Sequence, residues 1–587
     1  MFDMNRIDFK AETFGAPAAV SVAFNNSCGE VVYYKVTVDY PQKLFPERIK
    51  LHWFVPFGDI YSCWTPGGRF NHGLYTSWRP LDTNSRSASG APEFALISKG
   101  GENRCTFAVS DAATPMRLTA GVEESTGDIH CTIELFTSRV DEIMHYEALI
   151  RLDFSKAPYY KSITDVRKWW SELGYTPAQV PCDAKRAMFS SWYNFQKTIT
   201  EESVFEQCVV AKRLGMNTVI LDDGWQTDEQ HTGYTHCGDW VPAPSKFPDM
   251  RRFVDRLHAI GMKCILWYSV PFVGIYAENI HRFEGKYLRA KDGSRTVMCL
   301  DPRFPDVRSW LVETYESAVR DWDLDGLKLD FIDSFSLAED SSTEYDKMDC
   351  PSLEAAVEKL LNEITDALRK IKPKIMIEFR QSYIGPIMQK YGNILRVGDC
   401  AGGSIINRVS SIDLRLLTDN GTAVHSDMLL WDLSAAPEGA ADQLSNILFC
   451  VPQISIMPDK LPPEHEKMLK YYLEFMDSNR DVLLDGELVP LYPEANYAQV
   501  YARKGERLIA ALYSDPMFFI PEGVQDITIV NALGTPEVYI GCHKRFDGYY
   551  TVRNCLGDLA EAANFTLDDS VLCIEVPHNG FLEIKAE

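Results

Sequence analysis

Eight short apolar runs alternate with amphipathic helical stretches between residues 186 and 479, and this alternation constrains the fold more than any other feature of the sequence. Strand-helix units repeated in this way predict a parallel sheet with helices packed on it. Eight units in about 290 residues suit a (β/α)8 TIM barrel, which usually takes about 250 residues before insertions. A doubly wound open sheet is the alternative, but it does not naturally supply eight consecutive units. The predicted strands are 187–195, 218–222, 264–270, 326–332, 375–379, 394–397, 422–425 and 454–457, and the clearest helices are 204–214, 250–260, 307–321, 353–371 and 441–448.

Short alternating apolar runs flank this central region on both sides. From about residue 18 to 154 they are separated by Gly, Pro, Asn and Asp, which is typical of an antiparallel β-sandwich. A predicted helix over 163–173 then leads into the barrel, and after residue 480 short strands return with a hairpin turn at Lys504-Gly505-Glu506. We therefore predict a multidomain chain with an N-terminal β-sandwich and linker helix (1–175), a (β/α)8 barrel (176–480) and a C-terminal β-sandwich (481–587).

Composition narrows the classes of function. The chain has 587 residues, of which 45% are hydrophobic, and this is ordinary for a soluble globular protein. Its net charge of -24 opposes binding to nucleic acid or to an anionic membrane.

The start has no apolar core of the length a secretory signal requires, and the longest apolar stretch, about 447–457, is too short to span a bilayer. Fifteen scattered cysteines without a C-x-x-C pair predict neither a disulfide framework nor a zinc site, and they favour a reducing cytoplasm.

Lys328 and Asp330 stand two residues apart in the fourth predicted strand. Side chains alternate along a strand, so these two charges share one face while Leu327 and Leu329 share the other. A strand buried on both faces is normally a continuous run of Val, Ile and Leu, so the charges need a reason. In a barrel they would lie near the carboxyl end, where such barrels perform their chemistry. A structural ion pair inside the core is the alternative, and this strand alone does not decide between them.

Polar and aromatic residues follow nearly every predicted barrel strand. Each one alone has a structural explanation, because Asp often caps the next helix and Trp is usually a core residue. Their convergence on one rim favours a binding cleft, since capping needs only one Asp in each loop. These residues are Trp192, Asp222, Asp223, Trp225, Trp267, Lys328, Asp330, Glu378, Arg380, Asp399, His425, Asp427 and Trp431.

Carboxylates, tryptophans and basic side chains around a cleft without a metal motif suit a carbohydrate. Glycoside hydrolysis requires two carboxyl groups, one ionised and one protonated. Lys328 would keep Asp330 ionised, which suits a nucleophile. Asp399 follows an apolar strand, and apolar surroundings would raise its pKa, which suits an acid/base. Asp427 is a lower-ranked alternative for the acid/base.

Four sequence blocks resemble the α-galactosidases of glycoside hydrolase family 36. They are Leu221-Asp222-Asp223-Gly224-Trp225, Gly238-Asp239-Trp240, Lys246-Phe247-Pro248 and Lys328-Leu329-Asp330, in this order and at compatible spacing. The resemblance covers about residues 187–457 and implies a barrel between β domains. It also implies a retaining mechanism with Asp330 as nucleophile and Asp399 as acid/base, and sugar contacts from Asp222, Asp223 and Lys328.

The chain departs from the family pattern in three places. The family's Cys-Ser-Gly-Gly-Gly-x-Arg block after strand five, which helps to hold the sugar near its 2-position, is replaced by Glu378-Phe379-Arg380-Gln381-Ser382. Arg380 is the candidate substitute for the family arginine. Trp267-Tyr268-Ser269-Val270-Pro271 lacks the Glu of Trp-x-Glu-Pro, and His425-Ser426-Asp427 has no counterpart in the pattern. These departures leave the identity of the sugar open.

We therefore predict a retaining exo-α-glycosidase, with α-galactosidase activity as the best single assignment, acting on an oligosaccharide or glycoside. Two alternatives stay open: the same site in a transglycosylase or in an α-glycosidase of another sugar specificity, and a non-catalytic sugar-binding protein on a hydrolase scaffold. We expect no cofactor, no metal, no nucleic-acid partner and no membrane partner, and homo-oligomerisation is left open. The aromatic and glycine-rich segment 61–79 is predicted to be a folded surface loop or a domain contact, with closure over the barrel mouth as the alternative. The predicted catalytic residues are Asp330 and Asp399, and the predicted sugar contacts are Asp222, Asp223, Trp225, Lys328, Trp192, Trp267, Arg380 and Asp427.

Overall fold

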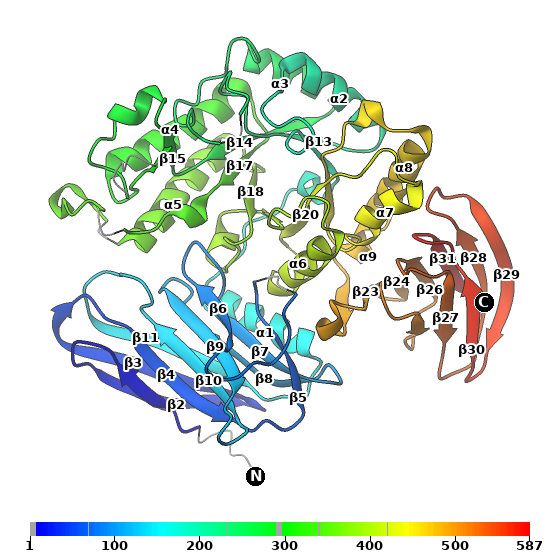
Figure 1. Cartoon of the computed structure of the whole chain (residues 1–587), viewed down its shortest axis with the longest axis horizontal. Coiled ribbons are helices and arrows are strands. Elements are labelled where there is room, and N and C mark those ends of the chain that lie inside the picture. Colours follow the sequence, from blue (N-terminus) through cyan, green and yellow to red (C-terminus); the bar gives the residue numbers. More distant parts are fainter. Residues whose placement is uncertain are drawn as a thin grey trace.

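The computed structural model of the chain describes residues 7–67, 70–231, 233–288, 296–338, 341–350, 352–418 and 421–587. A central barrel lies between an N-terminal pair of sheets and a C-terminal pair, which confirms the predicted fold class (Figure 1). The barrel and its helices share one large apolar core, while each flanking pair of sheets also encloses a core of its own. In the part of the chain that the structure describes, we find no helix with the length and apolarity to cross a membrane.

Eight parallel strands close the barrel in chain order, and β21 pairs with β12 to complete the circle. Leu327 and Leu329 pack into the large apolar core, whereas Lys328 and Asp330 hydrogen-bond with side chains from neighbouring barrel strands and loops. The alternation predicted for this strand is therefore present. The strands are β12 (Met188–Ser190), β13 (Thr218–Leu221), β14 (Lys263–Ser269), β17 (Gly326–Asp330), β18 (Met376–Arg380), β19 (Ile394–Arg396), β20 (Ala423–Leu429) and β21 (Val451–Ile454).

The last barrel strand differs from its prediction. β21 ends at Ile454, the residue at which the predicted strand 454–457 begins. Pro452 and Gln453 interrupt the apolar run over 447–457, and both lie inside β21, so the apolar residues after them were mistaken for the strand. β20 also extends further than predicted, through Asp427 to Leu429.

Helices cover the outside of the barrel, and the sequence analysis identifies most of them. The helix α6 is not among the predicted helices, although Ile405, Val409, Ile412 and Leu416 have helical spacing, and it is buried continuously from Asn407 to Leu417. The helices are α1 (Tyr159–Glu172), α2 (Glu201–Arg213), α3 (Met250–Ala259), α4 (Pro305–Trp322), α5 (Leu353–Ile371), α6 (Ser404–Leu417), α7 (Pro437–Ser445), α8 (Pro463–Ser478) and α9 (Arg480–Leu483).

The N-terminal region consists of two antiparallel sheets that pack face to face. One sheet has the order β1-β4-β10-β9-β6 and the other β2-β3-β11-β8-β7-β5. The predicted boundary of this domain at residue 175 stays a prediction, although α1 does lie between the sheets and the barrel. The strands are β1 (Lys10–Thr13), β2 (Ala19–Cys28), β3 (Val31–Leu44), β4 (Ile49–Val55), β5 (Ile60–Trp64), β6 (Leu81–Ser85), β7 (Glu93–Ser98), β8 (Asn103–Val109), β9 (Met116–Val122), β10 (Ile129–Leu135) and β11 (Ile143–Asp153).

The C-terminal sheets lie beside α7 and α8 (Figure 1). One has the order β22-β23-β24-β26-β31-β28-β29 and the other β25-β27-β30. The predicted hairpin turn joins β23 to β24, and Gly505 has the positive φ of 62° that such a turn favours. The strands are β22 (Glu487–Leu491), β23 (Gln499–Lys504), β24 (Arg507–Leu512), β25 (Met517–Phe519), β26 (Asp526–Asn531), β27 (Glu537–Gly541), β28 (Phe546–Arg553), β29 (Leu559–Leu567), β30 (Val571–Glu575) and β31 (Phe581–Ala586).

Candidate active site

Asp330 ends β17 with its carboxylate held by four donors. Oδ1 accepts from the backbone N–H of Phe331 at 2.9 Å, from Arg380 Nε at 2.7 Å and from the Tyr383 hydroxyl at 3.0 Å. Among the described residues, Oδ2 accepts only from Trp267 Nε1, at 3.0 Å. Oδ1 is therefore saturated, and Oδ2 is the oxygen with a lone pair to offer to a ligand.

The surroundings keep Asp330 ionised. Burial on its own would raise the pKa, but the charges of Arg380 and Lys328 and the hydrogen bond from Trp267 outweigh it, and the pKa is lowered to about 2. The sequence analysis assigned this effect to Lys328. In the structure Arg380 makes the larger contribution, because it contacts the carboxylate directly.

Lys328 forms its ion pair with Asp222, the first residue after β13. The distance from Lys328 Nζ to Asp222 Oδ2 is 2.7 Å, and both side chains are buried. The other oxygen, Oδ1, accepts from the backbone N–H of Asp223 at 2.9 Å. The backbone N–H of Asp222 donates to Ser191 Oγ at 3.0 Å, so the loops after β12 and β13 fix the pair together.

Asp223 has a partner that sequence analysis did not identify. Lys197 Nζ lies 3.3 Å from Asp223 Oδ2, and Gln226 Nε2 donates to Oδ1 at 2.7 Å. Burial raises the pKa of Asp223 in spite of Lys197. Gly224 is required beside it, because its φ is 116° and a Cβ there would lie 2.7 Å from the Lys197 Cα. Lys197 lies in no motif, so only the fold reveals it.

Asp399 lies in the loop after β19, and 61% of its side chain is exposed. Its Oδ1 accepts from Arg396 Nη2 at 2.9 Å. Partial desolvation by the surrounding loops raises the pKa of Asp399, but Arg396, Lys328 and Arg380 outweigh that effect and the pKa is lowered. The expected rise in the pKa of Asp399 is therefore wrong for this arrangement, because the apolar strand before it also carries Arg396.

Asp427 is completely buried, so the structure does not support a direct sugar contact for it. Its Oδ1 accepts from Arg396 Nη1 at 2.5 Å, and its Oδ2 accepts from the Tyr193 hydroxyl at 2.6 Å and the backbone N–H of Cys400 at 2.7 Å. The last bond ties Asp427 to the residue that follows Asp399. Asp427 therefore organises the loop that carries Asp399, and Tyr193 is a second member of this network that the sequence analysis missed.

The tryptophans divide into different roles. Trp225 is completely buried and its Nε1 donates to the carbonyl oxygen of Trp267 at 3.0 Å. It packs against Trp240 and Tyr268, so the predicted sugar contact is replaced by a core role. Trp267 is also buried and acts on Asp330 through its indole N–H. Trp192 is partly exposed after β12, which leaves an aromatic side chain accessible at the rim.

Tyr234 was not predicted as a site residue, yet it lies among the carboxylates. Its ring stacks on Trp267 with a centroid separation of 6.1 Å and an interplanar angle of 24°. Burial raises the pKa of its hydroxyl, and the charges of Asp330, Asp223 and Asp222 raise it further. Tyr234 therefore contributes a further aromatic side chain beside Trp267.

His425 is a structural residue. It is completely buried, its Nε2–H donates to the carbonyl oxygen of Ala184 at 2.7 Å, and its Nδ1 accepts from Gln453 Nε2 at 3.0 Å. Burial lowers the pKa of His425 to about 4, so the imidazole is neutral near pH 7. Ala184 precedes β12, so this histidine faces the amino end of the barrel and not the carboxylate rim.

Segment 61–79 contacts the barrel away from Asp330. Gly68 and Arg69 lie outside the described residues. Trp64 Nε1 donates to Asp413 Oδ1 of α6 at 2.8 Å, and the ring of the buried His72 contacts Tyr497 of the C-terminal region. Trp64 and His72 thus make domain contacts, which is one of the two structural alternatives that the sequence favoured.

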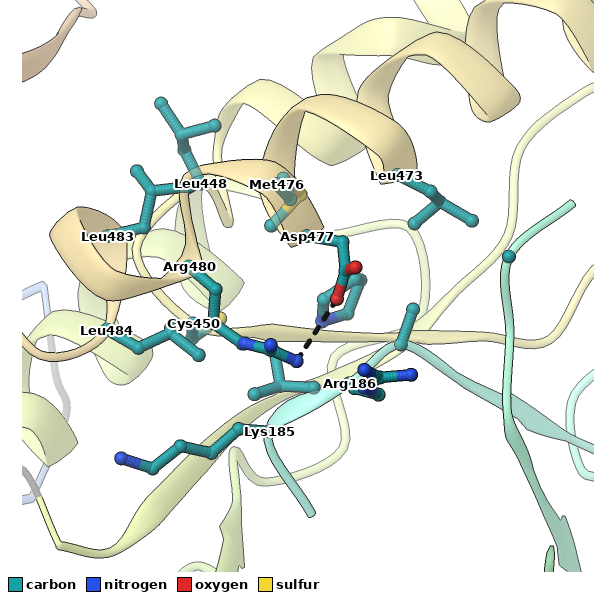
Figure 2. A pocket seen from close by; sticks show the side chains of 14 residues that line it. Lys185, Arg186, Leu448, Cys450, Leu473, Met476, Asp477, Arg480, Leu483 and Leu484 are labelled. Atoms are coloured by element: carbon teal, nitrogen blue, oxygen red, sulfur yellow. Dashed lines mark hydrogen bonds and ion pairs between the residues drawn. The ribbon is translucent and has the colours of Figure 1, made fainter. Parts of the chain in front are cut away.

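A cavity at the opposite end of the barrel is too small for a sugar (Figure 2). It has a volume of about 30 Å³, which is room for a water molecule. Lys185 and Arg186 line it, and they precede β12, so the cavity lies at the amino end of the strands. Barrel enzymes bind substrate at the carboxyl end, and this cavity does not compete with the rim around Asp330.

Residues 179–385 match the family model described as Melibiase. A 327-residue segment is 25% identical to the A type blood alpha-D-galactosamine galactosaminidase of Flavonifractor plautii and covers 48% of this chain and 29% of that protein. A 130-residue segment is 31% identical to alpha-galactosidase Mel36A of Lactobacillus acidophilus and covers 21% of this chain and 16% of that protein. The chain spans less than a third of the length of the curated relatives that it matches.

Solved structures agree in fold. The GH36 alpha-galactosidase AgaA of Geobacillus stearothermophilus superposes with a TM-score of 0.64 at 14% identity, over 95% of this chain and 80% of that chain. The alpha-galactosidase of Lactobacillus brevis gives a TM-score of 0.64 at 12% identity, over 99% of this chain and 85% of that chain. The chain therefore shares its fold with the family 36 alpha-galactosidase structures. The match to the Melibiase model falls on the barrel, over residues 179–385, and confirms the resemblance carried by the four sequence blocks.

Proposed function

We propose that the chain is a retaining exo-α-galactosidase. The observation that carries this proposal is Asp330, a buried carboxylate with a pKa of about 2 at the carboxyl end of a barrel strand. An ionised carboxylate with one fully saturated oxygen and one available oxygen suits a nucleophile. The sugar named in the alpha-galactosidase relatives is the source of the substrate assignment.

The proposed reaction has two displacements. Asp330 Oδ2 attacks the anomeric carbon, the bond to the glycosidic oxygen breaks, and protonated Asp399 gives its proton to that departing oxygen. Water then attacks the glycosyl-aspartate ester, Asp399 takes the proton from the water, and the bond to Asp330 breaks. Two inversions give overall retention.

Arg396 affects the protonation state of Asp399 in this reaction. The ion pair with Arg396 favours the ionised carboxylate, which suits the second step, in which Asp399 acts as base. For the first step Asp399 must leave Arg396 and carry a proton. We therefore propose that entry of a neutral glycoside separates the pair, and that the pair forms again once the leaving group has departed.

Asp222, Asp223 and Lys328 are the proposed contacts to sugar hydroxyls. The two carboxylates accept hydrogen bonds from hydroxyls and the ammonium group donates to them. The role of Arg380 at the sugar 2-position remains a proposal, because in this structure its Nε is already bonded to Asp330. A neutral sugar is insensitive to the net charge of -24, and we keep a cytoplasmic location as part of the proposal on the basis of cysteine usage.

A second sugar deserves a test. The match to the Flavonifractor plautii galactosaminidase covers 48% of this chain, and the chain lacks the family block near the sugar 2-position. The second candidate function is therefore the same retaining mechanism on an α-linked galactosamine.

The test is a panel of nitrophenyl glycosides, α- and β-linked, that includes galactose, galactosamine, N-acetylgalactosamine and glucose. We expect turnover of the α-galactoside, and NMR of the first product should show the α-anomer. Asp330→Asn should abolish turnover, whereas Asp325→Asn, at the amino end of the same strand, should retain it. Turnover of β-glycosides alone, or an active Asp330→Asn variant, would refute the proposal.

A further inference from the structure

The N-terminal sandwich reaches the loop after Asp330 through Arg86, which follows β6. Arg86 Nη2 donates to the carbonyl oxygen of Asp333 at 2.5 Å, and Nη1 donates to that of Phe335 at 2.6 Å. Nη1 also lies 3.7 Å from Glu354 at the start of α5. One guanidinium therefore connects the sandwich, the loop after β17 and a barrel helix, and its planar fork matches two carbonyls at once.

The loop that Arg86 holds is in a conformation that needs support. Phe331 has a φ of 65°, in the left-handed region that an aromatic residue rarely adopts. Its backbone N–H is one of the donors to Asp330 Oδ1. Strained residues of this kind persist only where the surrounding structure fixes them. The bonds from Arg86 to Asp333 and Phe335 fix the segment directly after it.

A chain of contacts leads from the same loop to the nucleophile. Asp333 Oδ2 accepts from Ser382 Oγ at 3.1 Å and lies 4.0 Å from Arg380 Nη1, while Arg380 Nε holds Asp330. The sandwich contacts this chain a second time, because the hydroxyls of Ser89 and Ser382 are 3.0 Å apart.

The second contact between sandwich and barrel is close. The backbone N–H of Gly90 donates to the carbonyl oxygen of Ser382 at 2.8 Å. A Cβ on Gly385 would lie 2.3 Å from the Gly90 carbonyl oxygen, so only glycine fits where the two loops meet. The sandwich loop is therefore held firmly against the loops that follow β17 and β18.

We infer that Arg86 is a positioning residue for the reaction: it holds the loop after β17 so that Arg380 and the Phe331 N–H keep Asp330 aligned. This inference rests on the proposed function, because it takes Asp330 as the nucleophile. In the described ranges, no hydrogen bond joins this loop to the proposed sugar contacts Asp222 and Lys328. Loss of Arg86 should therefore lower kcat and leave KM nearly unchanged.

Arg104 provides a matched control. It belongs to the same sandwich, its side chain is 19% exposed against 21% for Arg86, and its partners Asp59, Glu102 and Asn103 all lie within the sandwich. For Arg86→Ala we expect kcat on nitrophenyl α-galactoside to fall roughly 10- to 100-fold, which corresponds to about 1.4–2.7 kcal/mol. Arg104→Ala should change kcat by less than about twofold, although both variants lose an arginine of similar burial.

Chemical rescue separates positioning from general destabilisation. Arg86 lines a groove of about 680 Å³ between the sandwich and the barrel, so a guanidinium ion can reach the space that the truncated side chain leaves. Guanidinium chloride at low millimolar concentration should restore part of the kcat of Arg86→Ala, equal sodium chloride should not, and Arg86→Lys should recover less than the wild type.

Equal losses of kcat in Arg86→Ala and Arg104→Ala, or a loss confined to KM, would overturn the inference. So would a deficit in kcat that guanidinium does not relieve. If Arg86→Ala does not fold, Arg86→Gln is measured against Arg104→Gln with the same criteria. A wild-type protein without activity on the glycoside panel would instead refute the proposed function, so the two failures are distinguishable.

Discussion

Replacing Arg380 with Gln should move the acid limb of the pH profile upward. Arg380 Nε contacts Asp330 Oδ1 at 2.7 Å, and this pairing helps to hold the pKa of Asp330 at about 2 against the effect of burial. An opposite charge at this range typically shifts a carboxyl pKa by about 1–3 units, so the variant should titrate at about pH 3–5. The nucleophile must be ionised, and activity is therefore lost as the pH falls through that range.

Arg380→Gln should also lower kcat at neutral pH, for a reason other than protonation of Asp330. Asp330 stays ionised at pH 7 in the variant, so protonation explains none of the loss there. Removing one charge-assisted hydrogen bond is worth about 1.5–3 kcal/mol, which corresponds to a kcat lower by roughly 10- to 100-fold.

The assay is kcat/KM on nitrophenyl α-galactoside from pH 2.5 to 7, because this ratio reports the pKa values of the free enzyme. Each sample is returned to pH 7 and assayed again to exclude unfolding. Arg256→Gln is the control, since Arg256 pairs with Glu201 and Glu202, both on α2. An acid limb in Arg380→Gln that coincides with that of the wild type would refute this reasoning.

Three further predictions concern other buried or catalytic groups. Lys328→Met leaves the buried Asp222 without its partner and should lower the free energy of unfolding in urea by about 3–5 kcal/mol. The Lys328→Met, Asp222→Asn double variant should lose less stability than the sum of the two single losses, and losses that simply add would contradict an interaction between the two residues. Burial raises the pKa of Asp413 to about 7 from an ordinary value of 3.8, so its contribution to stability is present below about pH 4 and disappears as the pH rises through 7. Asp413→Asn should remove this slope, which amounts to about 4 kcal/mol, and an unchanged slope in urea unfolding from pH 4 to 8 would refute the assignment. Asp399→Ala should slow hydrolysis of a galactosyl disaccharide by about 10²- to 10⁴-fold. Hydrolysis of the nitrophenyl glycoside should slow much less, because nitrophenolate leaves without a proton. Equal losses of rate on the two substrates would exclude Asp399 as the acid.

The fold was predictable where the sequence pattern has a single physical cause. Runs such as 218–222 and 264–270 are short, apolar and bounded by polar residues, so the strands β13 and β14 follow directly from them. The strand β21 was misplaced because its apolar run is longer than the strand. The helix α6 was missed although its apolar residues have helical spacing, and the sequence did not indicate that its polar residues Arg408 and Asp413 would be buried as well.

The candidate site was predictable as a location more than as a set of contacts. Alternation along β17 placed Lys328 and Asp330 on the inner face, and the structure has them there. The partners of the carboxylates could not be predicted, because Lys197 and Tyr383 come from loops whose positions depend on the fold as a whole. Spacing also cannot distinguish an accessible tryptophan from a buried one, and this is why Trp225 was misassigned.

The pKa of Asp399 shows the same limit for electrostatics. Its neighbours in sequence are apolar or small, which suggested a raised pKa. In space the nearest charge is Arg396, three residues earlier, and Asp427 holds that arginine from the next strand. A pKa depends on charges within a few ångströms, and sequence distance does not report that separation.

The most direct test of the account is to trap the covalent intermediate. The protein is inactivated with 5-fluoro-α-galactosyl fluoride, digested, and the labelled peptide is sequenced by mass spectrometry. The account predicts a single galactosyl ester on Asp330, with no label in the Asp330→Asn variant. A label on Asp399, Asp427 or any other residue, or turnover of the reagent with no ester at all, would contradict it.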